Sequence, residues 1–219
     1  MIRPIMHDPL FLAQPSAPAI PADKQDTVDE LSAEPARLAN EFACTDGLPA
    51  VIRAREASAI GFLGNMPCLR DMMNQVTLDL CTRQFADDCE LYYLCGDDFG
   101  QQVASYRMFP RVWNKRLDCR NIACDPESQN LMLETLYQRL SDREEKAGDG
   151  ASQPWLVIFV HASDDVMQHP LMKYIDKAAQ LHAVFLFWAK HREQLPQGCR
   201  YMVRLFTNVR SGLLVDMFS

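Results

Sequence analysis

The sequence lacks three features, and each absence excludes a class of protein. Lys and Arg (22) are fewer than Asp and Glu (29), and the net charge of −7 argues against nonspecific binding to nucleic acid. No apolar run reaches the ~18 residues of a transmembrane helix, so we expect no membrane span in this stretch of chain. None of the eight cysteines belongs to a Cys-x-x-Cys pair, and a chain of this size needs no disulfides, so we interpret them as cytosolic thiols.

The composition that is present is typical of a globular protein. Hydrophobic residues make up 48% and charged residues 23%, which excludes a wholly disordered, collagenous or coiled-coil chain. Seven of the 13 prolines lie in the first 50 residues, in an acidic stretch that has little with which to build a core. We therefore predict an arm or linker over residues 1–47, with one or two helical turns within 28–42, and a folded domain over residues 48–219.

Strand and helix signals alternate through this domain. The runs WLVIFV (155–160) and AVFLFW (183–188) are apolar throughout, as is typical of central parallel strands covered on both faces. Shorter strands are expected at 50–53, 58–63, 90–95 and 121–124, and two closing strands at 199–206 and 212–218. Helices are expected from 67 to about 80, after Asp125-Pro126-Glu127, and after His169-Pro170. The pattern predicts an α/β fold with a doubly wound, mostly parallel sheet.

The segment IGFLGNMPCL (60–69) stands where a phosphate-binding loop belongs in such a fold. A working loop reads G-x-x-x-x-G-K-[ST], because backbone amides wrap a phosphate, a lysine reaches the β/γ oxygens and a hydroxyl holds magnesium. Counted from Gly61 through Gly64 and Asn65, the last three positions are Met66, Pro67 and Cys68. Pro67 has no amide hydrogen and no charge, and Cys68 is a poor magnesium ligand, so the sequence predicts a degenerate loop.

The second half of a nucleotide site is missing as well. In a P-loop fold the strand at 155–160 would end in an Asp and a Glu that hold magnesium and orient water, but His161 and Ala162 follow here. Asp164 and Asp165 are better interpreted as the start of a helix. We therefore expect no catalytic residue, no metal and no cofactor.

Other kinds of site stay open on the sequence alone. A small-molecule or nucleotide enzyme could use a rebuilt site around Asn65, Cys68 and His161, and a cysteine nucleophile would need His161 as its base. A zinc site could draw on Cys89, Cys95, Cys119 and Cys124, although their spacings are unusual. The chain could also be a free-standing interaction module.

One basic cluster is interleaved with aromatic residues between 106 and 120. It could be a partner surface, but we favour a solvated segment whose aromatic side chains anchor it to the sheet. Its members are Arg107, Arg111, Lys115, Arg116 and Arg120, with Tyr106, Phe109 and Trp113.

Taken in order, several segments resemble the first, degenerate ATPase domain of the FtsK/SpoIIIE-type coupling ATPase of type VII secretion systems, the EssC/EccC family. The similar phrases are DLCTRQFADDCE (79–90), YRMFPRVW (106–113), LYQRLSDRE (136–144), the strand at 155–160, PLMKY (170–174) and EQLPQGC (193–199). The resemblance covers about residues 45–219. The phrase at 106–113 departs from the family pattern, which puts a shared role of Tyr106, Phe109 and Arg111 in doubt.

The resemblance implies a P-loop NTPase-like (RecA-like) fold with a degenerate nucleotide site, in a fragment of a longer protein that is itself an ATPase. It implies a location on the cytoplasmic side of the cell membrane, with a membrane anchor N-terminal to this domain and further ATPase domains C-terminal to it. The implied partners are those neighbouring domains and membrane components of the secretion machinery, with oligomers of the full-length protein. The implied role is that of a pseudo-ATPase scaffold or regulator.

Overall fold

The computed structural model describes residues 52–84, 87–96, 99–146, 153–161, 163–206 and 212–217. Its centre is a seven-stranded sheet in the order β5-β2-β6-β7-β1-β8-β9. The strands are β1 (Ala59–Leu63), β2 (Cys89–Leu94), β5 (Ile122–Ala123), β6 (Trp155–His161), β7 (Ala183–Ala189), β8 (Tyr201–Leu205) and β9 (Gly212–Asp216). All neighbours are parallel except the β8–β9 hairpin, so the predicted doubly wound, mostly parallel sheet is confirmed. A separate antiparallel pair joins β3 (Trp113–Asn114) to β4 (Cys119–Arg120).

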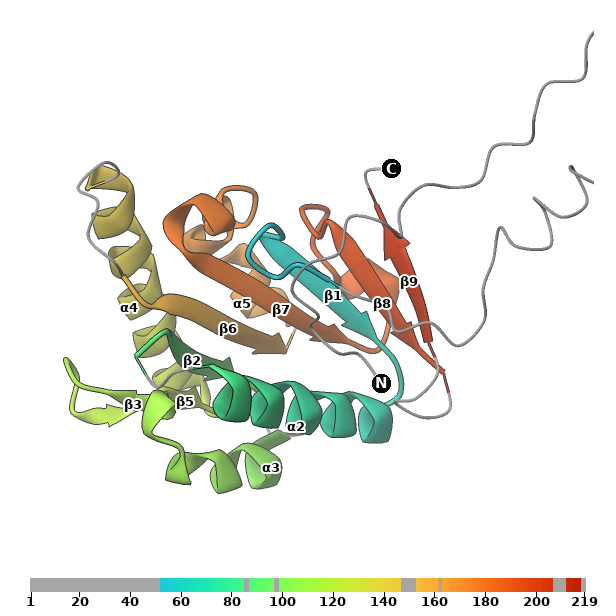
Figure 1. Ribbon diagram of the computed structural model, residues 1–219, viewed down its shortest axis with the longest axis horizontal. Helices are drawn as coiled ribbons and strands as arrows, with labels where there is room; N and C mark the ends of the chain where they lie inside the picture. Colours follow the sequence, from blue (N-terminus) through green and yellow to red (C-terminus); the bar gives the residue numbers. More distant parts are fainter. Residues whose placement is uncertain are drawn as a thin grey trace, which may run out of the picture. The chain divides into compact units, whose positions relative to one another are not determined.

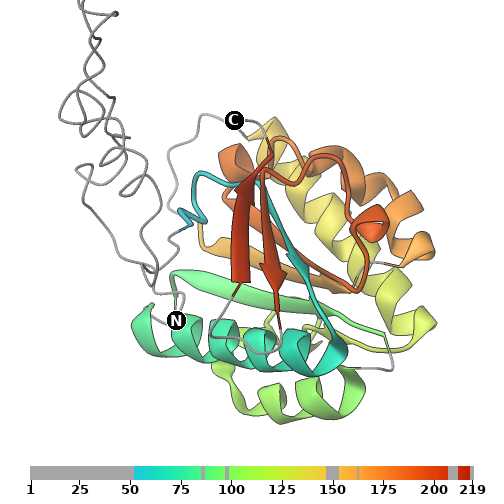
Figure 2. The same cartoon turned by 90° about the vertical axis from the view of Figure 1, so that its right-hand side faces the viewer.

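Helices cover both faces of the sheet (Figures 1 and 2). One face carries α2 (Met66–Arg83) and α3 (Gly100–Ser105), followed by the short 3-10 turns η4 (Tyr106–Met108) and η5 (Pro110–Val112). The other carries α4 (Pro126–Glu145), α5 (Asp164–Gln168), η6 (Pro170–Tyr174) and η7 (Ala178–Leu181). Parallel strands need such crossovers, and crossovers of one hand fall on opposite faces when the strand order reverses direction.

The apolar strands and the helix caps behave as the sequence predicted. Every residue of β7 is buried, as are five of the seven residues of β6, because both strands lie between two helical layers. At the start of α4, the Asp125 carboxylate accepts a hydrogen bond from the Ser128 backbone N–H at 2.9 Å, and Pro126 occupies the first turn. The cap satisfies an amide that the helix leaves unpaired.

Two local predictions were wrong. The segment after His169 forms the 3-10 turns η6 and η7 rather than one helix, and the left-handed His182 (φ 52°) ends η7 before β7 begins. Within 50–53, Ile52 and Arg53 belong to no strand, while residues 50 and 51 and the predicted turns at 28–42 lie outside the described residues. Among the described residues, no helix is long and apolar enough to cross a membrane.

Candidate functional site

The carboxyl ends of β1, β7 and β6 mark the position where an α/β sheet of this kind binds ligands. The chain leaves β1 through α2 on one face and leaves β7 toward η8 (Arg192–Gln194) and β8, so the order switches direction between these two strands. Ligands bind in the crevice at such a switch point. The residues around it are Asn65 after β1, Lys190 and His191 after β7, and His161 at the end of β6.

Only Gly64 and Asn65 connect β1 to α2. The Asn65 side chain accepts a hydrogen bond from the Cys68 backbone N–H at 2.9 Å, and Pro67 has no N–H to offer. A helix N-terminus normally leaves four N–H groups for a ligand, and here only those of Asn65 and Met66 remain. The Gly64 N–H donates to the Ala189 carbonyl at 3.4 Å, which ties the connection to the end of β7.

Gly61 is part of strand β1 rather than of the connection. It lies opposite Phe187 on one side and Met202 on the other, in register with both neighbouring strands. A Cβ at this position would lie 2.6 Å from Leu195 Cδ1, so the glycine makes room for the Leu195 side chain on the sheet. The stretch from Gly61 to Cys68 thus comprises the end of a strand, a two-residue turn and the first turn of a helix.

His161 is the last residue of β6, at the end of the strand where a P-loop fold places its magnesium-binding acid. The ring packs on Gly96, where an added Cβ would lie 3.2 Å from His161 Nδ1, and makes an edge contact with Phe99 at 5.2 Å between ring centres. Asp164 and Asp165 lie in the first turn of α5 after the N-cap residue Ser163, as expected for a helix start. Negative charge stabilises that end of a helix.

Aromatic rings occupy the sheet between Asn65 and His161. Trp188 lies opposite His161 on one side and opposite Phe62 on the other, and it stacks on Phe62 with ring centres 4.3 Å apart. Phe159 stacks on the same indole at 6.1 Å, and Trp188 has no solvent exposure. The centre of the switch point on this face is therefore apolar packing.

The structure does not bring Asn65, Cys68 and His161 into one site. Strand β7 separates β1 from β6, so the two strands are ~9.6 Å apart. Cys68 Sγ hydrogen bonds to the Phe206 carbonyl at 3.6 Å, on the β8 side of β1, whereas His161 packs toward β2. The two side chains point to opposite sides of the switch point, and the rebuilt-site hypothesis gains no support.

The cysteines form neither of the two kinds of site that the sequence left open, a nucleophilic thiol and a zinc site. Cys95, next to Gly96 and His161, is fully buried, and burial raises the pKa of its thiol well above the ordinary value, which disfavours a nucleophilic thiolate. Cys89 begins β2 and Cys95 follows its last residue, so they are ~20 Å apart along the strand and cannot share a zinc ion. Within the described ranges, no group of three or more His, Cys, Asp or Glu is placed to hold a metal.

The basic segment at 106–120 folds onto the protein through its aromatic residues, as predicted. Tyr106 is buried, with its ring centre 5.1 Å from that of Tyr93 on β2. Arg111 is also buried, which the sequence did not indicate: its guanidinium donates to the Leu80 carbonyl at 2.6 Å and to the Gln84 carbonyl at the end of α2. Arg111 therefore caps a helix.

The sequence interpretation missed two sets of residues. It did not single out His191, which lies at the switch point and caps η8 together with Gln194. It also passed over Arg139 and Arg143 on α4, although a spacing of four residues on a predicted helix places both on one face.

Comparisons with known proteins identify the fold. No protein-family model matches the chain, and no curated protein matches it significantly. Among solved structures, EssC (ATPases 2 and 3) from Geobacillus thermodenitrificans is similar with 10% identity and a TM-score of 0.51, over 67% of this chain and 31% of that chain. A structure of the cytoplasmic domain of EssC aligns with 12% identity and a TM-score of 0.48, over 64% of this chain and 30% of that one.

The chain therefore spans about a third of the length of these EssC structures. The first similarity shows that the described domain has the fold of an EssC ATPase domain, as the resemblance of the sequence implied. The predicted α/β fold is confirmed in the same way.

Proposed function

We propose that this chain is a non-hydrolysing domain of a type VII secretion coupling ATPase, and that it is a scaffold or regulatory domain within that motor. The observation that carries the proposal is the two-residue connection between β1 and α2, with Asn65 capping the helix and Pro67 in its first turn. The fold supports membership of the ATPase class, and the connection argues against hydrolysis.

A phosphate loop needs several backbone amides that point at one centre, together with a lysine and a hydroxyl. Here the Cys68 N–H already donates a hydrogen bond to the Asn65 side chain, and the Gly64 N–H donates one to the Ala189 carbonyl at the end of β7. Met66, Pro67 and Cys68 occupy the positions of the glycine, lysine and hydroxyl of the motif. A triphosphate bound here would lack both its amide cradle and its countercharge.

The end of β6, where a P-loop fold has its magnesium-binding acid, also argues against hydrolysis. A magnesium ion needs oxygen ligands, and His161 offers an imidazole that packs against Phe99 instead. The buried indole of Trp188 fills the sheet between this position and β1. Each of these departures from the nucleotide-binding motifs would weaken a nucleotide site by itself. Together they leave a bound nucleotide without its metal and phosphate contacts.

The EssC-like fold suggests which partners such a domain has. We propose that it contacts neighbouring ATPase domains of the same polypeptide and membrane components of the secretion machinery, on the cytoplasmic side of the membrane and as part of a membrane-anchored protein. Oligomers would then form in the full-length protein. Nucleic acid is not among the proposed partners, since a net charge of −7 repels it.

Isothermal titration of the chain with Mg-ATP, run beside a phosphate-release assay, tests the loss of hydrolysis. We expect no saturable heat at millimolar Mg-ATP and no turnover above the buffer blank. Micromolar binding with measurable turnover would contradict the proposal. Should binding occur without turnover, Met66→Glu tests whether the nucleotide lies at the β1–α2 connection. A carboxylate in the first turn of α2 is compatible with the helix but would repel a triphosphate bound there, and it would leave binding elsewhere unchanged.

The scaffold role needs a separate measurement on the natural polypeptide. We expect that exchanging the turn residues Gly64 and Asn65 for a working phosphate loop leaves secretion no higher than before, because the domain contributes contacts rather than turnover. Removing the whole domain is expected to change the ATPase rate of the remaining domains. An unchanged rate and unchanged secretion would contradict a scaffold or regulatory role.

A further inference from the structure

Two cysteines lie side by side at the carboxyl ends of β2 and β5. Strand β5 is the edge of the sheet next to β2 (Figure 1), and the parallel register of the two strands pairs Leu94 with Ala123. The pairing continues one residue further, because the Cys95 N–H donates a hydrogen bond to the Ala123 carbonyl at 3.0 Å. The register therefore places Cys95 opposite Cys124.

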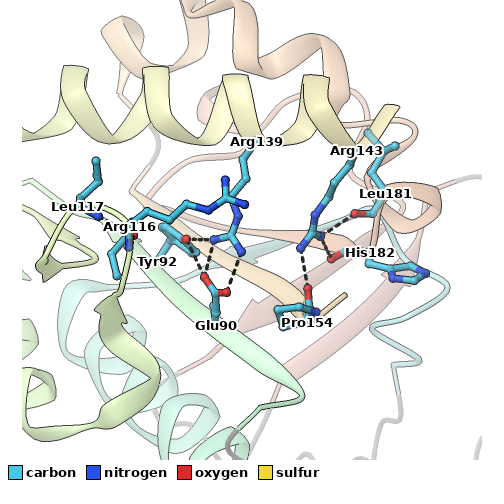
Figure 3. Close-up of polar contacts among 10 residues, drawn as sticks. Glu90, Tyr92, Arg116, Leu117, Arg139, Arg143, Pro154, Leu181 and His182 are labelled. Atoms are coloured by element: carbon cyan, nitrogen blue, oxygen red, sulfur yellow. Dashed lines mark hydrogen bonds and ion pairs between the residues drawn. The ribbon is translucent and has the colours of Figure 1, made fainter. Parts of the chain in front are cut away.

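The two cysteine side chains lie on the same face of the sheet. Tyr92 points toward α4, where its hydroxyl meets an arginine of that helix (Figure 3). Side chains alternate along a strand, so Tyr93 and Cys95 point to the opposite face, where the Tyr93 hydroxyl lies 2.9 Å from Thr77 Oγ1 of α2. Residues paired on neighbouring parallel strands point the same way, and Cys124 therefore shares this face with Cys95.

The separation of the two residues fits a disulfide bond. Neighbouring strands lie ~4.8 Å apart, and disulfides join Cα atoms that are ~4.4–6.8 Å apart. Burial raises the pKa of the Cys95 thiol, and the nearby Cys124 thiol raises it further, an effect that needs the two sulfurs to be close. Both thiols are reduced in this structure. The bond can thus form without moving the backbone of either strand.

The two thiols differ in their access to solvent. Cys95 has no solvent exposure, whereas Cys124 is half-buried. An oxidant dissolved in water therefore reaches Cys124 first. An accessible cysteine beside a second, resolving cysteine is the arrangement that redox-sensitive sites use.

We propose that Cys95 and Cys124 are an oxidation site, at which a peroxide converts the two thiols to a reversible disulfide. The Cys124 thiolate attacks a peroxide oxygen, so that an S–O bond forms, the O–O bond breaks, and the second oxygen leaves as water with the proton of the Cys124 thiol. The Cys95 sulfur then attacks the sulfur of the Cys124 sulfenic acid, so that the S–S bond forms and the S–O bond breaks. The departing hydroxide takes the Cys95 proton and leaves as a second water molecule, and the peroxide has accepted both electrons.

The disulfide would fasten the edge of the sheet. Strand β5 has only two residues and is joined to β2 by the Cys95 hydrogen bond and by a bond from the Tyr93 N–H to the Asn121 carbonyl at 2.8 Å. The S–S bond closes residues 96–123, which include the basic segment at 106–120, into a covalent loop. Such a loop restricts the unfolded chain, so the oxidised protein is the more stable form. The inference is independent of the proposed loss of hydrolysis.

Peptide mapping of the parent chain tests the proposal. The chain is treated with hydrogen peroxide, the remaining thiols are alkylated, and the protein is digested with trypsin without reduction. Cleavage after arginine puts the two cysteines on separate peptides, 84–107 and 121–139. We expect mass spectrometry to find these peptides joined, with fragmentation assigning the bond to Cys95 rather than to Cys89 of the same peptide. The oxidised chain should melt about 5 °C higher than the reduced chain, and dithiothreitol should reverse both changes.

Three variants separate this site from general thiol oxidation. Cys124→Ser is expected to abolish both the cross-link and the rise in melting temperature. Cys119→Ser is the matched control, because Cys119 is also half-buried but lies opposite Asn114 in the separate β3–β4 pair, and both effects should remain. In Cys95→Ala, the sulfenic acid on Cys124 should persist and react with dimedone. Should Cys95→Ala fail to fold, the peptide map of the parent chain still decides the question.

Three outcomes would overturn the proposal. The first is oxidation of Cys124 to sulfinic acid without any cross-link to Cys95. The second is a cross-link from Cys124 to Cys89, to Cys119 or to a second chain, which would show random collision of exposed thiols. The third is an equal loss of the melting-temperature rise in Cys119→Ser and Cys124→Ser.

Discussion

Arg143 connects the C-terminal end of α4 to the starts of two central strands. Its guanidinium donates from Nη1 to the Leu181 carbonyl at 2.8 Å and to the His182 carbonyl at 2.9 Å, and from Nη2 to the Pro154 carbonyl at 2.7 Å. Arg143 is only 8% exposed. Arg143→Met removes all three hydrogen bonds while keeping an unbranched side chain of similar length.

Two opposing effects set the size of the loss. Hydrogen bonds to a charged group each contribute ~1.5–3 kcal/mol, and the three carbonyls would be left without this donor. Against this, burial and the nearby Arg139 lower the pKa of Arg143 to about 10, which shows that the charged guanidinium is partly destabilised where it lies. We therefore expect Arg143→Met to lower the free energy of unfolding by about 2–3 kcal/mol, well below the sum of three bonds.

Urea unfolding followed by circular dichroism measures this difference, with Arg107→Met as the control at an exposed position. The control is expected to stay within ~0.5 kcal/mol of the parent chain. The midpoint for Arg143→Met should fall with an unchanged m-value, and its melting temperature should drop by roughly 4–10 °C. A change no larger than that of the control would refute the reasoning, because it would mean that water replaces the guanidinium at the three carbonyls without loss.

Two further predictions concern the cap of α2 and the ion pair of Glu90. Asn65→Ala should lower the free energy of unfolding by about 1 kcal/mol and Asn65→Asp by much less, and equal values for the two in urea unfolding would argue against the side-chain cap. Burial raises the pKa of Glu90, but hydrogen bonds from Arg139 and Tyr92 outweigh it, so the pKa lies below its ordinary value. The ionised Glu90 carboxylate thus stabilises the fold above pH ~4.5, and this stabilisation is lost as the pH falls further. The difference in free energy of unfolding between the parent chain and Glu90→Gln should therefore shrink between about pH 7 and pH 3. A difference that stays constant would contradict the pairing.

The elements that could be predicted are those whose signal is local. The runs that became β6 and β7 are apolar throughout because both faces of the sheet are covered, and Asp125 with Pro126 starts α4 through contacts within one turn. The prediction of one helix after His169 failed because the short turns there are stabilised by packing against α4 rather than by a periodic pattern in their own sequence.

The site could be predicted in residue type but not in geometry. The sequence places Pro67 and Cys68 where a lysine and a hydroxyl belong, and the strand predicted over 58–63 contains Gly61, yet nothing in the sequence indicates that Leu195 packs over that glycine. Arg116 and Arg139 line one hollow beside α4, but they are far apart in sequence, and only the fold of the β3–β4 pair beside α4 brings them together (Figure 3).

The most direct measurement follows the backbone amides of Met66 and Cys68 by NMR while Mg-ATP is added. The Cys68 amide is already bonded to the Asn65 side chain, and the unpaired Met66 amide has neither a lysine nor a hydroxyl beside it to hold a phosphate, so both resonances should stay in place up to millimolar nucleotide. Saturable shifts of these two amides at micromolar Mg-ATP would show a triphosphate bound at the start of α2, and the proposal of a non-hydrolysing scaffold would lose its physical basis.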